Sequence, residues 1–149
     1  MNVALSPDDI ARACADAMWK EDDASSGLGM KIVEVKPGQA TLTMTVAPHM
    51  VNGQRIAHGG FIFLLADSTF AFACNSRNER TVAAQCDITF IRPGKLGDVL
   101  VATAREISRS GRSGIYDISV SVEDVVIAEL RGHSRTIGGV WLPAEAEAK

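Results

Sequence analysis

Apolar and polar positions follow two different periods along the chain, and these periods predict its helices and strands. Apolar residues recur at helical spacing between Ile10 and Met18, which predicts an amphipathic helix over residues 7–21. Ser6 precedes this helix and suits an N-cap position, because its hydroxyl can accept a hydrogen bond from a free backbone amide. Residues 22–29, which follow, lack a clear period and are predicted to form a loop.

The most apolar stretch, HGGFIFLLADSTFAFACN, runs from His58 to Asn75. It is apolar around its whole circumference, so we expect a helix with no face for water, buried in the core. From Phe61 to Cys74 this helix would be only about 21 Å long, which is too short to cross a bilayer. Asp67 lies in its middle, and a buried charge is costly unless it has a partner, a shifted pKa or a task.

Six stretches alternate with a period of two, which predicts β-strands before and after the central helix in the sequence. The predicted strands cover residues 30–36, 40–46, 81–91, 99–107, 115–122 and 125–137. Consecutive hairpins imply an antiparallel sheet, and the long helix must be what this sheet wraps. The pattern therefore predicts an α+β fold, in which a curved antiparallel sheet surrounds one long helix and a further helix lies at the N-terminus.

Composition narrows the class of protein. A chain of 149 residues is enough for one domain, which we expect to span residues 1–149 with a core at about 7–139 and a frayed tail at 143–149. The net charge of −3 argues against a nucleic-acid partner, and no stretch resembles a signal peptide or a membrane span, so a cytoplasmic protein is expected.

The cysteines and histidines give no sign of a disulfide framework or of a metal site. The three cysteines are scattered as Cys14, Cys74 and Cys86, and the three histidines have no ligand spacing. Cys74 and Cys86 fall in core-like patterns, so we expect buried thiols rather than nucleophiles.

Two glycines, Gly59 and Gly60, lie where the central helix is predicted to begin. Glycine lowers helix propensity, so the pair has a local cost. In return, a ligand can approach the backbone amides closely, and the positive end of the helix suits a developing oxyanion or a polarised carbonyl. The alternative is that the glycines allow tight packing of the helix start against a loop.

Asp67 lies seven residues beyond Gly60, about 10 Å further along a helix axis. A catalytic carboxylate and an oxyanion donor must meet at one carbonyl group, so one helix cannot supply both to the same site. Two copies running antiparallel could, each giving its helix N-terminus to the other's Asp67, which would make the functional unit at least a dimer. The alternative is a buried carboxylate bonded to the hydroxyl of Ser68 or Thr69.

A linked set of motifs resembles a known family. Asn52, the HGG motif at 58–60, Asp67 within an apolar helix and TVAAQCDITFIRPGKLGD at 81–98 are similar in order and spacing to the hotdog-fold thioesterases. Within these, the chain most resembles the phenylacetic-acid-degradation acyl-CoA thioesterases (the PaaI type), and the segments GRSGIYDISVSVED and RGHSRTIGG are similar to them too. The resemblance covers roughly residues 7–139.

The resemblance implies hydrolysis of an aromatic, phenylacetyl- or hydroxyphenylacetyl-type acyl-CoA, without a cofactor, by a homotetramer built from hotdog dimers. Asp67 matches the catalytic carboxylate of the family, acting as nucleophile or as general base for water. Gly59 matches the backbone donor to the thioester oxygen. His58 and Asn52 match loop residues that shape the site, although Asn52 and Gly53 also suit a plain turn.

Further residues are candidates for substrate binding. Some relatives carry a serine or threonine hydroxyl near position 83, where this chain has Ala83. Thr81 is the candidate to replace that hydroxyl. Gly60 and Pro93 are the other candidates for substrate binding. Coenzyme A carries several phosphate charges, and we expect two or three of the cations near strand ends to meet them. These are Arg92, Lys95, Arg109, Arg112, Arg131 and Arg135.

The sequence is also compatible with two other functions. Hotdog hydratases and dehydratases pair a histidine with an acid on the helix, a pattern that His58 and Asp67 could also fit. A non-catalytic acyl-CoA sensor or binding protein is the second alternative, although no DNA-binding segment is visible.

Overall fold

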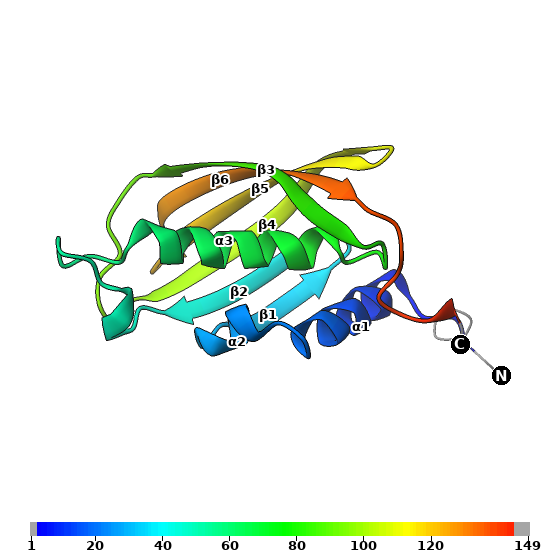
Figure 1. The fold of residues 1–149 in the computed structure, drawn as a ribbon, viewed down its shortest axis with the longest axis horizontal. Helices are drawn as coiled ribbons and strands as arrows, with labels where there is room; N and C mark the ends of the chain where they lie inside the picture. Colours follow the sequence, from blue (N-terminus) through cyan, green and yellow to red (C-terminus); the bar gives the residue numbers. More distant parts are fainter. Residues whose placement is uncertain (1–2, 145–149) are drawn as a thin grey trace.

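A six-stranded antiparallel sheet curves around one long helix in the computed structural model of the chain, which describes residues 3–144 (Figure 1). The helices are α1 (Pro7–Trp19), α2 (Asp23–Gly27) and α3 (Gly59–Cys74), with a short 3-10 turn at Pro48–Met50. The strands are β1 (Lys31–Lys36), β2 (Gln39–Thr45), β3 (Thr81–Phe90), β4 (Val99–Ser110), β5 (Ser113–Val122) and β6 (Val125–Thr136). The predicted α+β architecture and the six predicted strands are confirmed.

The strand order is β1-β2-β4-β5-β6-β3, so the expectation of consecutive hairpins is correct only in part. The hairpins β1–β2, β4–β5 and β5–β6 form, but β3 pairs with β6 at one edge and β4 pairs with β2. The connection after β3 crosses the end of the sheet. It begins where the Ile91 amide donates to the Ile127 carbonyl, and it ends where the Gly97 amide donates to the Val46 carbonyl.

The N-terminal helices lie alongside β1, at one edge of the sheet (Figure 1). Ser6 caps α1 as predicted, because its hydroxyl accepts from the Asp9 amide at 3.1 Å. The prediction of a plain loop at 22–29 is wrong, since the Asp22 carboxylate accepts from the Ser25 amide at 2.9 Å and starts α2. The buried Ser25 hydroxyl then lies 2.8 Å from the Ser68 hydroxyl, which holds α2 against α3.

Helix α3 is buried on one face and half-buried on the other. Leu65, Ala66 and Phe70 pack into the core, and a Cβ at Gly132 of β6 would lie only 2.6 Å from the Phe70 ring. In the single chain, however, a stripe along the opposite face is only half-buried. It consists of Phe61, Leu64, Asp67 and Ala71. The expectation of a helix without any face for water is therefore wrong for one copy of the chain.

The end of the described chain folds back onto the residues that follow α3. The Trp141 indole donates to the Asn75 side chain at 2.8 Å, and the Leu142 amide donates to the Asn78 side chain at the same distance. Of the tail expected at 143–149, residues 145–149 lie outside the described residues. No helix within residues 3–144 is long and apolar enough to cross a membrane.

Candidate functional site

The N-terminus of α3 presents one backbone amide that has no acceptor in the described part of the chain. His58 is the N-cap residue, and its Nδ1 accepts a hydrogen bond from the Gly60 amide at 2.9 Å. The His58 carbonyl accepts from the Phe61 amide at 3.0 Å. The amide of Gly59 has no acceptor among residues 3–144. Gly59 is therefore the donor left to bind an oxygen at the positive end of the helix.

The absence of a side chain at Gly59 also serves packing. A Cβ there would lie 2.9 Å from Cζ of Phe90, the last residue of β3, which is closer than Cβ atoms approach in real structures. At Gly60, a Cβ would lie 3.1 Å from Nδ1 of His58. The two interpretations of the glycine pair, close packing and an accessible amide, therefore both apply at position 59.

A cleft of about 540 Å³ opens beside the Gly59 amide. It brings together four residues that the sequence analysis singled out: Asn52, Gly59, Arg92 and Pro93. Sequence reasoning missed the rest of its lining, which consists of Gln54, Ile56, Ala57, Ile62, Phe90 and Ile91. The apolar part of this lining suits an organic substituent next to an amide donor.

Asn52 orders the loop that leads into the cleft. Its side-chain oxygen accepts from the Gln54 amide at 3.0 Å and from the Ile56 amide at 3.4 Å. Val51 and Ala57 pair as an isolated bridge, which closes the loop. The turn-forming alternative for Asn52 is thus present in the structure, and the same turn holds this residue at the cleft.

The Asp67 carboxylate lies on the half-buried face of α3 and contacts a thiol. Sγ of Cys86 on β3 lies 3.9 Å from its Oδ1. The alternative partners are excluded, since the Ser68 hydroxyl bonds to Ser25 and the Thr69 hydroxyl donates to the Leu65 carbonyl at 2.7 Å. Burial raises the pKa of the Asp67 carboxyl, and the bond from Cys86 opposes this increase.

Gly59 and Asp67 cannot act on one carbonyl within one chain. They lie eight residues apart on the same helix, which is about 12 Å along its axis. A reacting carbonyl must lie roughly 3 Å from each group. The described residues therefore provide two half-sites, a donor at the helix tip and an acid two turns further on.

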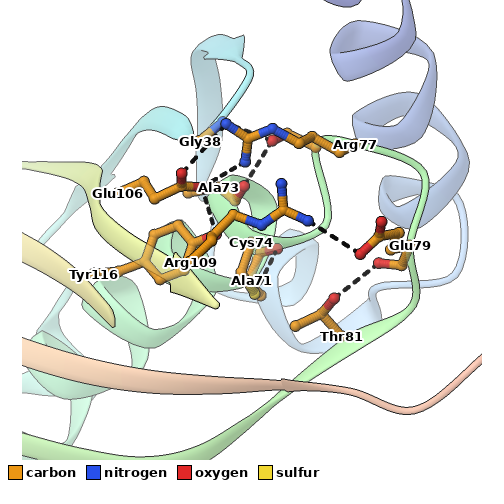
Figure 2. Close-up of polar contacts among 11 residues, drawn as sticks. Gly38, Ala71, Ala73, Cys74, Arg77, Glu79, Thr81, Glu106, Arg109 and Tyr116 are labelled. Carbon is orange, nitrogen blue, oxygen red and sulfur yellow. Dashed lines mark hydrogen bonds and ion pairs between the residues drawn. The ribbon is translucent and has the colours of Figure 1, made fainter. Parts of the chain in front are cut away.

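Other predicted residues lie at the opposite end of α3, around Cys74 (Figure 2). Arg109 forms an ion pair with Glu79 at 3.2 Å, and the Thr81 hydroxyl donates to the Glu79 carbonyl at 2.9 Å. Arg112 lines the same region. The structure thus separates these three residues from the Gly59 cleft of their own chain.

The remaining predicted residues belong to β3, β6 and the connection after β3. Arg92 lines the cleft and donates to the Val126 carbonyl at 2.8 Å. Arg131 lies on the outer face of the sheet, where it donates to both oxygens of Asp117, at 2.7 and 2.9 Å. Ala83 pairs with the buried Ser134 of β6 and so lies on the inner face.

An ion-pair cluster anchors the sheet to the C-terminal end of α3 (Figure 2). Arg77 pairs with Glu106 of β4, and the hydroxyl of the buried Tyr116 donates to the same carboxylate at 2.9 Å. Burial and the neighbouring Glu106 raise the pKa of Tyr116. Because all three groups are engaged with one another, this cluster fixes the position of α3 against the sheet.

Comparison with known proteins shows which family this chain is similar to. The model of a family described as the thioesterase superfamily matches residues 54–129. Acyl-coenzyme A thioesterase PaaI of Escherichia coli strain K12 is 44% identical over 126 residues, which is 84% of this chain and 90% of that protein. A putative esterase of Archaeoglobus fulgidus is 35% identical over 105 residues, which is 70% of this chain and 68% of that protein.

Solved structures agree with these relatives. The structure of the E. coli PaaI protein from the phenylacetic acid degradation operon superimposes with a TM-score of 0.89 at 41% identity, covering 91% of this chain and 99% of that chain. The protein smu.793 of Streptococcus mutans UA159, solved bound to acetyl CoA, gives a TM-score of 0.72 at 25% identity, covering 74% and 90%.

Proposed function

The chain belongs to the thioesterase superfamily and is a thioester hydrolase of hotdog fold. We propose that its substrate is an aromatic acyl-CoA, which it cleaves to the free acid and coenzyme A. The acyl group would be of phenylacetyl or hydroxyphenylacetyl type. The observation that carries the proposal is the unused Gly59 amide, which opens onto a partly apolar cleft at the positive end of α3. We further propose that residues 1–149 form a single domain that works in the cytoplasm.

In the proposed reaction, the Gly59 amide donates to the thioester carbonyl oxygen and stabilises the negative charge that develops there. Asp67 removes a proton from water, and the hydroxide that forms attacks the carbonyl carbon. The C–S bond then breaks, and the coenzyme A thiolate leaves and takes up a proton. Alternatively, the Asp67 carboxylate attacks the carbonyl directly and water hydrolyses the anhydride that results. In either case, the raised pKa of Asp67 makes it a better base or nucleophile.

We propose that a second copy completes each site, with its α3 antiparallel to the first, and that two such dimers form a tetramer. The half-buried stripe of Phe61, Leu64 and Ala71 around Asp67 supports this arrangement, since a second helix would cover it. The exposed apolar side chains of edge strand β3 support it too: Val82 is 45% exposed and Phe90 51%. His58 would shape the helix tip by capping it, and Asn52 by ordering the adjacent loop.

Of the cations, Arg92 is the best placed to meet a coenzyme A phosphate, because it lines the cleft beside Gly59 and Pro93. We expect Arg109, Arg112 and Arg131 to contribute only where a second copy brings them to that cleft. Gly60 and Ala83 would give the substrate room, and Thr81, which is bonded to Glu79, would need to turn to hold water.

A substrate panel tests the reaction. Phenylacetyl-, hydroxyphenylacetyl-, benzoyl- and straight-chain acyl-CoAs are assayed for thioester loss, and enoyl-CoA is assayed for hydration. We expect the arylacetyl thioesters to give the highest kcat/KM. Preference for straight chains would refute the aromatic assignment, whereas hydration without hydrolysis, or binding without product, would refute the proposed reaction.

Hybrid dimers test the shared site. Asp67→Asn and Gly59→Pro chains, each inactive alone, are mixed after unfolding and refolded together. In a shared site, a hybrid dimer contains one centre with an intact Gly59 and an intact Asp67, so random mixing should restore about a quarter of wild-type activity. A site within one chain would restore nothing, because every chain carries a defect.

A further inference from the structure

Asp67 has a neighbour that the proposed reaction does not yet use. We propose that Cys86 is a positioning residue, whose thiol holds one oxygen of the Asp67 carboxylate and leaves the other oxygen to face water or the substrate. This inference rests on the proposed function, since it assumes that Asp67 is the catalytic acid. The contact that carries it is the 3.9 Å distance from Sγ of Cys86 to Oδ1 of Asp67.

The pairing and register of β3 place this thiol next to α3. Cys86 pairs with Gly132 of β6, and the β3 register shifts between Ala83 and Gln85. A shift of one residue in a strand exchanges the two faces, so this irregularity brings both Ala83 and Cys86 to the inner face. Without it, the alternation that places Ala83 inward would turn position 86 away from α3.

The thiol can act only as a donor in this contact. Burial, together with the charge of Asp67 and the hydrogen bond to it, raises the pKa of Cys86 to about 11. At neutral pH the group is therefore protonated, and a protonated thiol is a poor nucleophile. Its proton is directed at Oδ1, which restricts rotation of the carboxylate.

A cysteine suits this position better than a hydroxyl residue would. A thiol is a weak donor, so it orients the carboxylate but lowers its basicity little. A serine hydroxyl is a stronger donor than a thiol, and once the Asp67 side chain moves toward its shorter reach it would make Asp67 a weaker base.

The other groups near Asp67 add no charge. The nearest further ionisable group on α3 is Cys74, two turns along the helix. Burial raises the pKa of Cys74 to about 12, so this thiol is uncharged at neutral pH. On the α2 side, the contact is the uncharged Ser25–Ser68 pair.

The test compares the pH dependence of kcat in the wild type, Cys86→Ser and Cys86→Ala. The acid limb of this profile reports the pKa of Asp67 in the enzyme–substrate complex. We expect its midpoint to move to lower pH in Cys86→Ser, where the donor is stronger, and to higher pH in Cys86→Ala, where burial acts unopposed. In Cys86→Ala, kcat above the acid limb should also fall about 2- to 10-fold, since the carboxylate is no longer held. A purely structural role would leave both midpoints at the wild-type value or move them the same way, and either result overturns the proposal.

Asp67→Asn separates this inference from the proposed function. If Asp67→Asn keeps its activity, the proposed mechanism fails. If Asp67→Asn is inactive but neither Cys86 variant moves the acid limb, only the role of Cys86 fails. Should the Cys86 variants not fold, the infrared S–H stretching bands of the wild type and Asp67→Ala decide instead. One band should move to higher frequency when the acceptor is removed, and identical spectra would overturn the proposal.

Discussion

Replacing Gly59 by proline tests the oxyanion donor with little change to the fold. Proline removes the backbone N–H, and the Gly59 amide has no acceptor among residues 3–144, so no hydrogen bond within that part of the chain is lost. Gly59 is the first residue of α3, the helical position that best tolerates proline. His58, with φ −62° and ψ 131°, already has the extended conformation that a following proline requires.

The matched control is Gly59→Ala, which keeps the amide but adds a side chain at the same place. In both variants the new Cβ would lie 2.9 Å from the Phe90 ring, so both must displace that half-exposed ring or the helix tip. Relief of this overlap costs about 1–3 kcal/mol, and we expect both variants to lose some activity for this reason. The difference between them isolates the N–H group.

We expect kcat of Gly59→Pro to be about 10²- to 10³-fold below that of Gly59→Ala, the usual effect of removing one oxyanion donor. The melting temperature of the proline variant should equal or exceed that of the alanine variant, because proline restricts the unfolded chain. Hydrolysis is followed by the loss of thioester ultraviolet absorbance, which reports cleavage of the C–S bond directly. Equal kcat values in two folded variants would refute the role of the Gly59 amide.

Three further substitutions test other parts of the site and fold. Asp67→Asn should lower kcat about 10²- to 10⁴-fold, whereas Asp16→Asn, on an exposed face of α1, should not. Burial raises the pKa of the Asp67 carboxyl, so its ionisation lowers the stability of the wild type as the pH rises through the folded-state pKa. Asp67→Asn has no such group, so its melting temperature relative to that of the wild type should rise with pH. A difference that does not change with pH would contradict this. His58→Ala removes the cap of α3 and should cost about 1 kcal/mol of stability in a denaturant titration, with His58→Asn restoring most of it. Tyr116→Phe removes a 2.9 Å bond to the Glu106 carboxylate and should lower the free energy of unfolding by about 1.5–3 kcal/mol without changing KM; an unchanged free energy would contradict the importance of this bond.

The sequence predicted the elements whose period is long and regular, and it failed where tertiary contacts decide. Helix α1 and the strands follow from apolar periodicity, and α3 follows from its length and its continuous apolar character. The five residues of α2 are too few to show a period, and this helix depends on its Asp22 cap and on the Ser25–Ser68 contact. The position of β3 at the edge could not be read from the chain either, because its pairing with β6 joins distant segments.

The candidate site was predictable at the helix tip and less so elsewhere. Asn52 and Gly59 lie close to each other in the sequence and share one cleft, which Arg92 joins from just beyond the end of β3. The contact between Asp67 and Cys86 was missed, because it depends on the register of β3 against the helix, which a sequence pattern does not specify. The core-like pattern of β3 predicts that Cys86 faces inward as a buried thiol, but it does not predict the contact with Asp67.

Strand β3 has a consequence for how this protein tolerates change. At one end its Phe90 lies against Gly59, and near its middle Cys86 contacts Asp67. In the proposed dimer these two groups serve different centres, so every centre is built from a piece of β3 from each copy. A single inherited substitution at Phe90 or Cys86 would therefore alter the same wall of both centres at once, which leaves these positions of β3 little freedom to vary.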